Sequence, residues 1–258
     1  MSSQCPFCSA KTIHSKWREL GYSKCASCGL YFRNPMPTPQ ELDNLYNRVW
    51  SDTTKPRVGM GGTNERLSGI YTRELINTLG RQDLQNLKIL DYGAGRGDFS
   101  GAMKQKGAEM ICLEPFGYDY LVKEGFTVYK ELNELKIVEE LDGIVMVDVW
   151  EHLTEPWKVM EACGKLLRPN GWLFIATANP LGLNARLRGS RWREARKPSH
   201  LLFPEPRTLE KMYKNAGFTK WQHLKWPIKY SDRILTAALH YLLQRTGLDG
   251  ELRYIAWK

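Results

Sequence analysis

The stretch ILDYGAGRGDF, residues 89–99, decides how the rest of the chain is interpreted. It begins as an apolar strand, reaches the acid Asp91, and continues with glycines at positions 93, 95 and 97. The dinucleotide fingerprint G-x-G-x-x-G would need a further glycine where Asp98 stands. The Asp91 carboxylate would also repel a pyrophosphate, because like charges close together raise the energy. The stretch therefore predicts a strand–turn–helix unit that holds a cationic ligand.

A second carboxylate makes this expectation more specific. Glu114 lies 21 residues after Gly93, at the end of the next predicted strand. A carboxylate at that place can accept hydrogen bonds from both hydroxyls of a ribose. S-adenosylmethionine has a ribose, an ammonium and a sulfonium but no phosphate, so it suits Asp91 and Glu114 together. The alternative is an ordinary strand–helix turn with a surface acid.

From about residue 64 the chain alternates between helical and strand patterns. The expected helices span residues 65–79, 100–106, 118–124, 156–167, 205–216 and 231–245. The expected strands span residues 87–92, 110–113, 127–129, 143–147, 172–176, 218–226 and 252–257, the last two forming an antiparallel pair. This order predicts an α/β protein with a doubly wound, Rossmann-like, seven-stranded and mostly parallel sheet. Ligands of such sheets bind at the carboxyl ends of the strands.

Four of the six cysteines form two C-x-x-C pairs with sixteen residues between them: Cys5, Cys8, Cys25 and Cys28. This spacing is typical of a four-cysteine zinc ribbon. Four thiolates complete a tetrahedron and leave no position for water, so the zinc would be structural. Redox-active C-x-x-C motifs or unpaired thiols are the alternatives. Cys112 and Cys163 lie among apolar residues and are expected in the core.

The pattern divides the chain into three parts: a zinc ribbon over residues 1–36, a linker over 37–64 and the large domain over 65–258. Prolines at positions 35, 37 and 39 predict an extended exit from the ribbon, followed by a short helix that carries Leu42, Leu45 and Tyr46. Residues 51–62 are polar and glycine-rich, which makes them the best candidate for a linker or a mobile lid.

Composition narrows the class of protein further. Of the 258 residues 42% are hydrophobic and 25% charged, as in globular proteins with a real core. The longest apolar stretches, such as residues 234–243, are far shorter than the roughly 20 residues of a membrane span. The N-terminus lacks the pattern of a signal peptide, so the cytoplasm is the expected compartment. The net charge of +9 permits an anionic partner.

Asp91-Tyr-Gly93-Ala94-Gly95 followed by Glu114 resembles motif I of class I S-adenosylmethionine-dependent methyltransferases, and residues 148–179 resemble their fourth-to-fifth-strand signature. The resemblance extends from about residue 65 to the C-terminus. It implies cofactor contacts at eight positions: Asp91, Gly93, Ala94, Gly95, Glu114, Pro115, Asp148 and Val149. The cysteine pairs and the proline-rich exit are similar to a subfamily with an N-terminal zinc ribbon, many of whose members act on saccharides or secondary metabolites.

Two histidines are candidates for catalysis. His152 follows the fourth strand of the large domain, and His200 lies beyond the fifth, on the side where acceptors enter this fold. Histidine suits the removal of an acceptor proton because its unperturbed pKa is near neutrality. The alternatives are that His152 only pins its loop by hydrogen bonds and that His200 only packs within one.

Asp148-x-x-Glu151-His152 with the distant His200 also resembles a metal-binding pattern. It is similar to the divalent-ion sites of ubiquinone-pathway O-methyltransferases and of small-RNA 2′-O-methyltransferases. Carboxylates and imidazoles are plausible ligands for such an ion. This chain departs from those families in having Asp rather than Glu at position 148.

A basic run covers residues 186–197, with five arginines, Lys197, one acid and the interleaved Trp192. Guanidinium groups bind phosphate in a bidentate manner, so this segment could recognise a phosphorylated small molecule or RNA, while the plain alternative is a solvated loop.

Taken together, these features favour O-methylation of a saccharide-like or anionic small molecule as the function, and RNA methylation is the second candidate. The apolar stripe Leu235, Ala238, Leu239 and Leu242 predicts a C-terminal helix that packs on the sheet, and a membrane-surface or dimer contact is the alternative.

Overall fold

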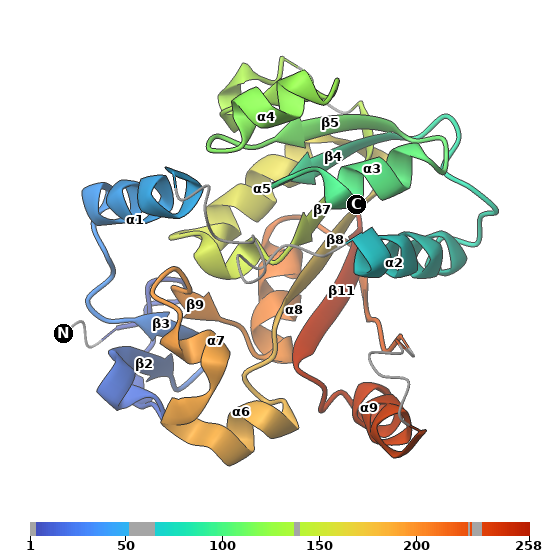
Figure 1. Ribbon diagram of the computed structural model, residues 1–258. Helices are drawn as coiled ribbons and strands as arrows, with labels where there is room; N and C mark the ends of the chain where they lie inside the picture. Colours follow the sequence, from blue (N-terminus) through green and yellow to red (C-terminus); the bar gives the residue numbers. More distant parts are fainter. Residues whose placement is uncertain (1–3, 52–64, 137–139, 227, 229–233) are drawn as a thin grey trace.

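The computed structural model describes residues 4–51, 65–136, 140–226, 228 and 234–258. Within these ranges the chain forms a large sheet with helices on both faces and a smaller N-terminal sheet beside it (Figure 1). Among the helices of the described part, none is both long and apolar enough to cross a bilayer.

The large sheet has seven strands in the order β10-β11-β8-β7-β4-β5-β6. Their bounds are β4 (Lys88–Tyr92), β5 (Glu109–Leu113), β6 (Thr127–Tyr129), β7 (Leu141–Val147), β8 (Leu167–Ala178), β10 (Lys220–His223) and β11 (Glu251–Trp257). Strands β4 to β8 pair in parallel, whereas β11 pairs antiparallel with β8 and with β10. The predicted doubly wound, mostly parallel sheet and its closing antiparallel pair are confirmed.

Helices cover both faces of this sheet because its strands alternate apolar side chains between two cores. Ile89 of β4 belongs to the cluster under α2 (Glu65–Thr78) and α3 (Asp98–Lys104). The next residue, Leu90, belongs to the cluster under α5 (Pro156–Leu166) and α8 (Pro206–Asn215), and α4 (Tyr118–Lys123) packs beside β6. Cys112 and Cys163 are both fully buried, as predicted.

The N-terminal sheet contains β1 (Thr12–His14), β2 (Tyr22–Cys25) and β3 (Tyr31–Arg33), with the short 3-10 helix η1 (Arg18–Leu20) between the first two. Its fourth strand is β9 (Leu202–Phe203), which comes from the segment after β8 and pairs antiparallel with β3. The ribbon sheet is therefore completed by a strand from the large domain (Figure 1).

The basic run is helical rather than a plain loop. It forms α6 (Leu183–Arg188), the 3-10 helix η4 (Gly189–Arg191) and α7 (Arg193–Arg196), which we call the insert. Trp192 is buried and stacks on Trp17 of the ribbon, with ring centroids 4.9 Å apart. Its ring is thus part of the core between ribbon and insert, which the sequence did not indicate.

Helix α1 (Pro39–Ser51) follows the ribbon and is longer than predicted, while most of the linker candidate, residues 52–62, lies outside the described ranges. The C-terminal helix is α9 (Ile234–Thr246). The prediction that its Leu239 and Leu242 pack on the sheet is wrong, because these side chains are 51% and 58% exposed. The helix is instead anchored on its other side, where buried Gln244 donates a hydrogen bond to the Ile228 carbonyl.

Candidate active site

The turn between β4 and α3 has the backbone that the glycine pattern predicts. Gly93, Gly95 and Gly97 all have positive φ angles, of 76°, 57° and 78°. At Gly93 a side chain would also collide, because a Cβ there would lie 2.5 Å from Cγ2 of Val149. The end of β4 therefore touches the end of β7 through bare backbone.

Asp91 lies at the end of β4 and is 3% exposed. Its Oδ2 accepts a hydrogen bond of 2.6 Å from the Ser100 hydroxyl of α3. Burial raises the pKa of Asp91 to about 6, and the Ser100 hydrogen bond opposes this rise. The carboxylate is thus mostly ionised at neutral pH and attractive to a cation. The sequence did not single out Ser100.

Glu114 lies just beyond β5 and binds the main chain of two turns. Its Oε2 accepts from the Gly95 amide at 2.9 Å, and its Oε1 from the amides of Phe116 and Gly117 at 2.9 and 3.2 Å. Burial raises the pKa of this carboxyl and the three amides oppose the rise. A carboxylate has about four lone-pair sites, so three amides leave capacity for a ribose hydroxyl.

The end of β7 carries an acidic pair, the half-buried Asp148 and the buried Glu151. Asp148 has a φ of 54°, and Glu151 is 1% exposed and accepts a 2.7 Å hydrogen bond from the Thr177 hydroxyl. Burial raises the pKa of both carboxyls, to about 7 for Glu151, and the nearby Glu151 charge raises that of Asp148 further. Near neutral pH this pair holds a proton more readily than surface acids do.

His152 and His200 meet beside this acidic pair. Their ring centroids are 4.7 Å apart, and one ligand atom each from Glu151, His152 and His200 lies within 4.8 Å of the others. Burial and the Lys197 charge lower the pKa of His152 to about 4; burial and His152 itself lower that of His200 to about 2. Both imidazoles are therefore neutral at physiological pH and able to accept a proton or to ligate a cation.

His200 has one nitrogen without a hydrogen bond in the described part of the chain. This atom, Nδ1, is buried and lies 3.8 Å from Oε2 of Glu194 on α7. Lys197 lies 2.6 Å from the same Glu194 oxygen. The sequence pointed to the basic run but did not single out Glu194 as its link to His200.

Helix α1 covers this group of residues. The hydroxyl of Tyr46 lies 3.0 Å from Nδ1 of His152, and its ring stacks on Phe116 with centroids 5.1 Å apart. Tyr46 therefore bridges the loop after Glu114 and the loop after β7. Its place on the helical stripe with Leu42 and Leu45 was visible in the sequence, but nothing there indicated a contact with His152.

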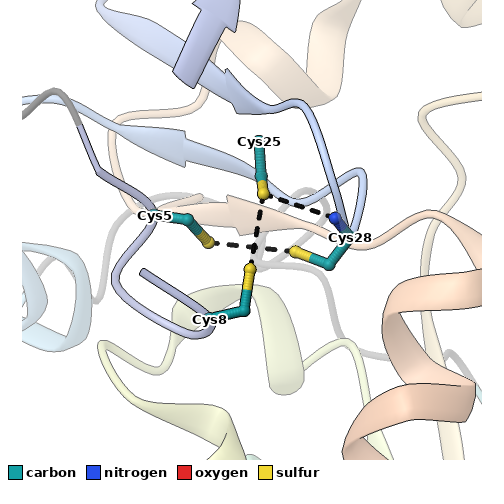
Figure 2. A group of neighbouring side chains, drawn as sticks. All are labelled: Cys5, Cys8, Cys25 and Cys28. Carbon is teal, nitrogen blue, oxygen red and sulfur yellow. Dashed lines mark hydrogen bonds between the residues drawn. The ribbon is translucent and has the colours of Figure 1, made fainter. Parts of the chain in front are cut away.

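The four ribbon cysteines converge on one point (Figure 2). The Sγ atoms are 3.8 Å apart for Cys5 and Cys28 and 3.5 Å apart for Cys8 and Cys25. Sulfur atoms bound tetrahedrally at about 2.3 Å from zinc would be about 3.8 Å apart, so the geometry fits that ion. The hydrogen bond from Cys28 lowers the pKa of the Cys5 thiol to about 5, which favours a thiolate there.

The surface formed by the insert and the ribbon is strongly basic. Arg186, Arg188, Arg191 and Arg196 are exposed. Lys16 of the ribbon donates a 2.7 Å hydrogen bond to the Pro180 carbonyl, and burial together with the Arg186 charge lowers its pKa to about 8. Positive charge is therefore crowded on the segment that leads to His200, which favours anionic ligands.

A family model described as a methyltransferase domain matches residues 64–223, more than half of the chain. The chain therefore belongs to this family, and it is an S-adenosylmethionine-dependent methyltransferase of the class I fold. The glycine turn and the two carboxylates at the ends of β4 and β5 lie inside the matched range.

Curated relatives share part of the chain. The "Ubiquinone biosynthesis O-methyltransferase" of Leptothrix cholodnii is 30% identical over 114 residues, which cover 40% of this chain and 48% of that protein. The protein of the same name from Pseudomonas aeruginosa PAO1 is 31% identical over 110 residues, covering 38% and 47%. The chain thus matches about half the length of these relatives.

Solved structures share the fold. A methyltransferase from Archaeoglobus fulgidus superposes with a TM-score of 0.56 at 20% identity, covering 76% of this chain and 95% of that one. The 1,6-didemethyltoxoflavin-N1-methyltransferase of Burkholderia thailandensis, solved with S-adenosylhomocysteine, gives a TM-score of 0.57 at 16% identity, covering 90% and 96%. At 20% and 16% identity, these similarities show that the chain shares the fold of these two proteins, and nothing about its substrate.

Proposed function

We propose that this methyltransferase moves a methyl group from S-adenosylmethionine to a hydroxyl oxygen of a saccharide-like or anionic small molecule. The observation that carries the proposal is the convergence of Glu151, His152 and His200 within 4.8 Å of one another. S-adenosylmethionine supplies a methyl carbon already activated by sulfonium. The protein then has to align the acceptor, exclude water and take up its hydroxyl proton.

The ends of β4 and β5 are proposed to bind the cofactor. Asp91 would hold the ammonium and Glu114 the ribose, while Gly93 and Gly95 let the backbone approach closely. Four more residues would line the same site: Ala94 between the two glycines, Pro115 after Glu114, and Asp148 and Val149 after β7. The methyl group would then point toward the His152 side, because β7 lies next to β4 in the sheet.

A neutral imidazole of His200 or His152 is proposed to receive the acceptor proton. The acceptor oxygen forms its bond to the methyl carbon as the carbon–sulfur bond breaks, and the hydroxyl proton passes to the ring nitrogen. The lowered pKa values leave both histidines neutral before the reaction, and proton uptake requires the bound ligands to raise the pKa of the accepting ring toward neutrality. Tyr46 would close the site on the side of α1 through its contact with His152.

The same side chains support a second way of activating the acceptor. The carboxylate of Glu151 and the imidazoles of His152 and His200 are a donor set that suits a divalent cation. Such an ion would lower the pKa of a bound hydroxyl. Transfer that is abolished by a chelator while the ribbon keeps its zinc, and is restored by Mg²⁺, would favour the ion; transfer that is insensitive to chelation would favour the histidine alone.

The ribbon is proposed to bind one structural zinc through Cys5, Cys8, Cys25 and Cys28. The sulfur separations support this, as does the burial of three of the four cysteines. A zinc site of this kind leaves no open position, so it would contribute to folding rather than to chemistry.

The experiment is a transfer assay with methyl-labelled cofactor. The acceptors are glucose 6-phosphate, UDP-glucose, 3,4-dihydroxybenzoate and a short single-stranded RNA. We expect a methyl ether on at least one of the small anions. We also expect His200→Gln and His152→Gln to lower kcat by about 10²- to 10⁴-fold, the usual contribution of a general base. His14→Gln, on an exposed ribbon strand, is the control.

Two results would contradict the proposal. One is transfer to the RNA alone, with affinity that falls steeply with salt as phosphate contacts require. The other is full activity of both histidine variants toward a small-molecule acceptor.

A further inference from the structure

The ribbon makes buried contacts to the main chain around His200 that neither cofactor binding nor zinc binding requires. We propose that Tyr22 and Arg33 of the ribbon are positioning residues of the acceptor site, which hold His200 in place by binding the carbonyl groups of its segment. This inference rests on the proposed function, in which His200 faces the acceptor. It makes the ribbon a part of the active site rather than an appendage.

The contacts converge on a short stretch of main chain. The Tyr22 hydroxyl donates to the His200 carbonyl at 2.6 Å, and Nε of Arg33 donates to the same oxygen at 3.2 Å. Nη2 of Arg33 also donates to the carbonyls of Lys197 and Ala195, at 3.0 and 3.5 Å. Two ribbon side chains thus satisfy three carbonyls, one inside α7 and two between α7 and β9.

The backbone continues this connection toward the acidic pair. The amide of Arg33 donates to the Leu201 carbonyl at 2.8 Å, and the amide of Leu201 donates to the Glu151 carbonyl at 2.7 Å. Leu201 therefore joins strand β3 of the ribbon to the loop after β7. The ribbon fixes His200 and Glu151 relative to each other through one residue.

Tyr22 and Arg33 act as a pair. They lie opposite each other in the β2–β3 register, and the Arg33 guanidinium lies 4.3 Å from the centre of the Tyr22 ring. Tyr22 is 2% exposed, so solvent does not compete with the His200 carbonyl for its hydroxyl. Because the His200 carbonyl accepts from both side chains, the pair holds this segment of main chain in one geometry.

The His200 ring depends on that main chain for its orientation. Its Nδ1 has no hydrogen-bond partner in the described ranges, and the ring contacts the rings of His152 and Phe203, at centroid distances of 4.7 and 5.8 Å. Ring contacts tolerate rotation far better than hydrogen bonds do. A shift of the backbone would therefore move the ring away from the acceptor.

The ribbon is itself fixed on the opposite side. The Thr208 hydroxyl donates to the Cys28 carbonyl at 2.7 Å, and Lys24 lies 2.6 Å from Glu205. Gly29 leaves no space, since a Cβ there would lie 2.3 Å from the Glu205 carboxylate. The cysteine turn thus rests on the start of α8, which gives Tyr22 and Arg33 a rigid base.

The test uses the full-length, zinc-loaded protein with the variants Tyr22→Phe and Arg33→Lys. Tyr22→Phe removes only one hydroxyl, and Arg33→Lys keeps the charge but cannot bind three carbonyls at once. The controls are Tyr241→Phe, on the exposed face of α9, and Arg18→Lys, whose exposed side chain lies 3.4 Å from Nδ1 of His14. Ring-labelled NMR spectra of the five histidines report on His200, assigned through His200→Gln.

We expect the His200 ring signal to shift or broaden in both ribbon variants and in neither control. The Kd for S-adenosylhomocysteine should stay within about twofold, because the side-chain hydrogen bonds of Tyr22 and Arg33 go to main-chain carbonyls outside the proposed cofactor contacts. With the best acceptor of the panel, kcat should fall by about 10- to 100-fold, the cost of misplacing a reacting group.

An unchanged His200 signal in both ribbon variants would overturn the inference, whatever the transfer activity. If the His200 signal shifts in the ribbon variants but the wild-type protein methylates none of the small anions, the positioning role of Tyr22 and Arg33 is supported and the proposed function is contradicted. The two claims therefore fail in different measurements.

Discussion

The hydroxyl of Tyr46 lies 3.0 Å from Nδ1 of His152 and joins helix α1 to the end of strand β7. The same ring stacks on Phe116, which follows the Glu114 carboxylate. One aromatic side chain from the N-terminal part of the chain thus touches both the cofactor side and the acceptor side of the candidate site. This contact fixes one edge of the His152 imidazole.

Replacing Tyr46 by phenylalanine separates these two roles. The stack on Phe116 would remain, whereas the hydrogen bond to His152 would be lost. We expect kcat to fall about fivefold, since one net hydrogen bond contributes about 1 kcal/mol. Steady-state kinetics beside calorimetry with S-adenosylhomocysteine would check this. Equal losses in kcat and in cofactor affinity would contradict the assignment of Tyr46 to the acceptor side.

Asp91 gives cofactor binding a defined dependence on pH. Burial raises its folded-state pKa to about 6, above the unfolded value, so its contribution to stability is present in acid and is lost as pH rises through 6. Cofactor binding has the opposite requirement, because only the ionised carboxylate attracts the ammonium. Affinity for S-adenosylhomocysteine should therefore fall as pH drops below about 6 and be level just above it.

The variant Asp91→Asn tests the origin of that dependence. We expect affinity at pH 7.5 to drop by about 10- to 100-fold, as for the loss of a hydrogen bond to a charged group, and the bend near pH 6 to disappear. Isothermal titration between pH 5 and 8 gives both results. A bend that persists in the variant would assign it to another group.

Two glycines, one in the turn before α3 and one inside that helix, should respond oppositely to alanine. Gly93→Ala forces a side chain into a left-handed backbone and to within 2.5 Å of Val149, so it should lower stability by more than about 1 kcal/mol and weaken cofactor binding. Gly101→Ala lies inside α3 with open space around it, so it should raise stability by up to about 1 kcal/mol. Urea unfolding of both variants is the measurement, and equal effects would contradict this account of the turn.

The cysteine site predicts one zinc ion per chain. Cys28→Ser should abolish the bound zinc and lower Tm, because the metal supplies folding energy that so small a sheet lacks. Cys163→Ala, at a core cysteine of α5 outside the four-cysteine group, should also lower Tm but keep the zinc. Atomic absorption together with thermal unfolding distinguishes the two. Wild-type protein purified without zinc, yet equally stable, would speak against a structural metal.

Local patterns in the sequence were sufficient for the large sheet. Glycines at 93, 95 and 97 and the period of the strands place Asp91 and Glu114 at adjacent strand ends, and the structure has them there. These features depend on interactions between residues that are near in sequence or on burial of whole strands. Such patterns can be recognised without knowing the fold.

Contacts between distant segments were not visible in this way. Strand β9 has only two residues, and it forms because β3, about 170 positions earlier, offers a free edge. The pairing of Trp17 with Trp192 and of Tyr22 with the His200 carbonyl likewise joins segments that no local pattern connects. The exposed Leu239 and Leu242 show the converse, since an apolar stripe does not reveal whether anything covers it.

The central claim is that two carboxylates at neighbouring strand ends hold S-adenosylmethionine. Calorimetric titration of the zinc-loaded protein with S-adenosylhomocysteine, repeated on the variant carrying both Asp91→Asn and Glu114→Gln, tests it most directly. The account predicts clear binding to the wild-type protein and none measurable to the double variant. Equal affinity of the two proteins, or no heat with either while NAD binds, would contradict it.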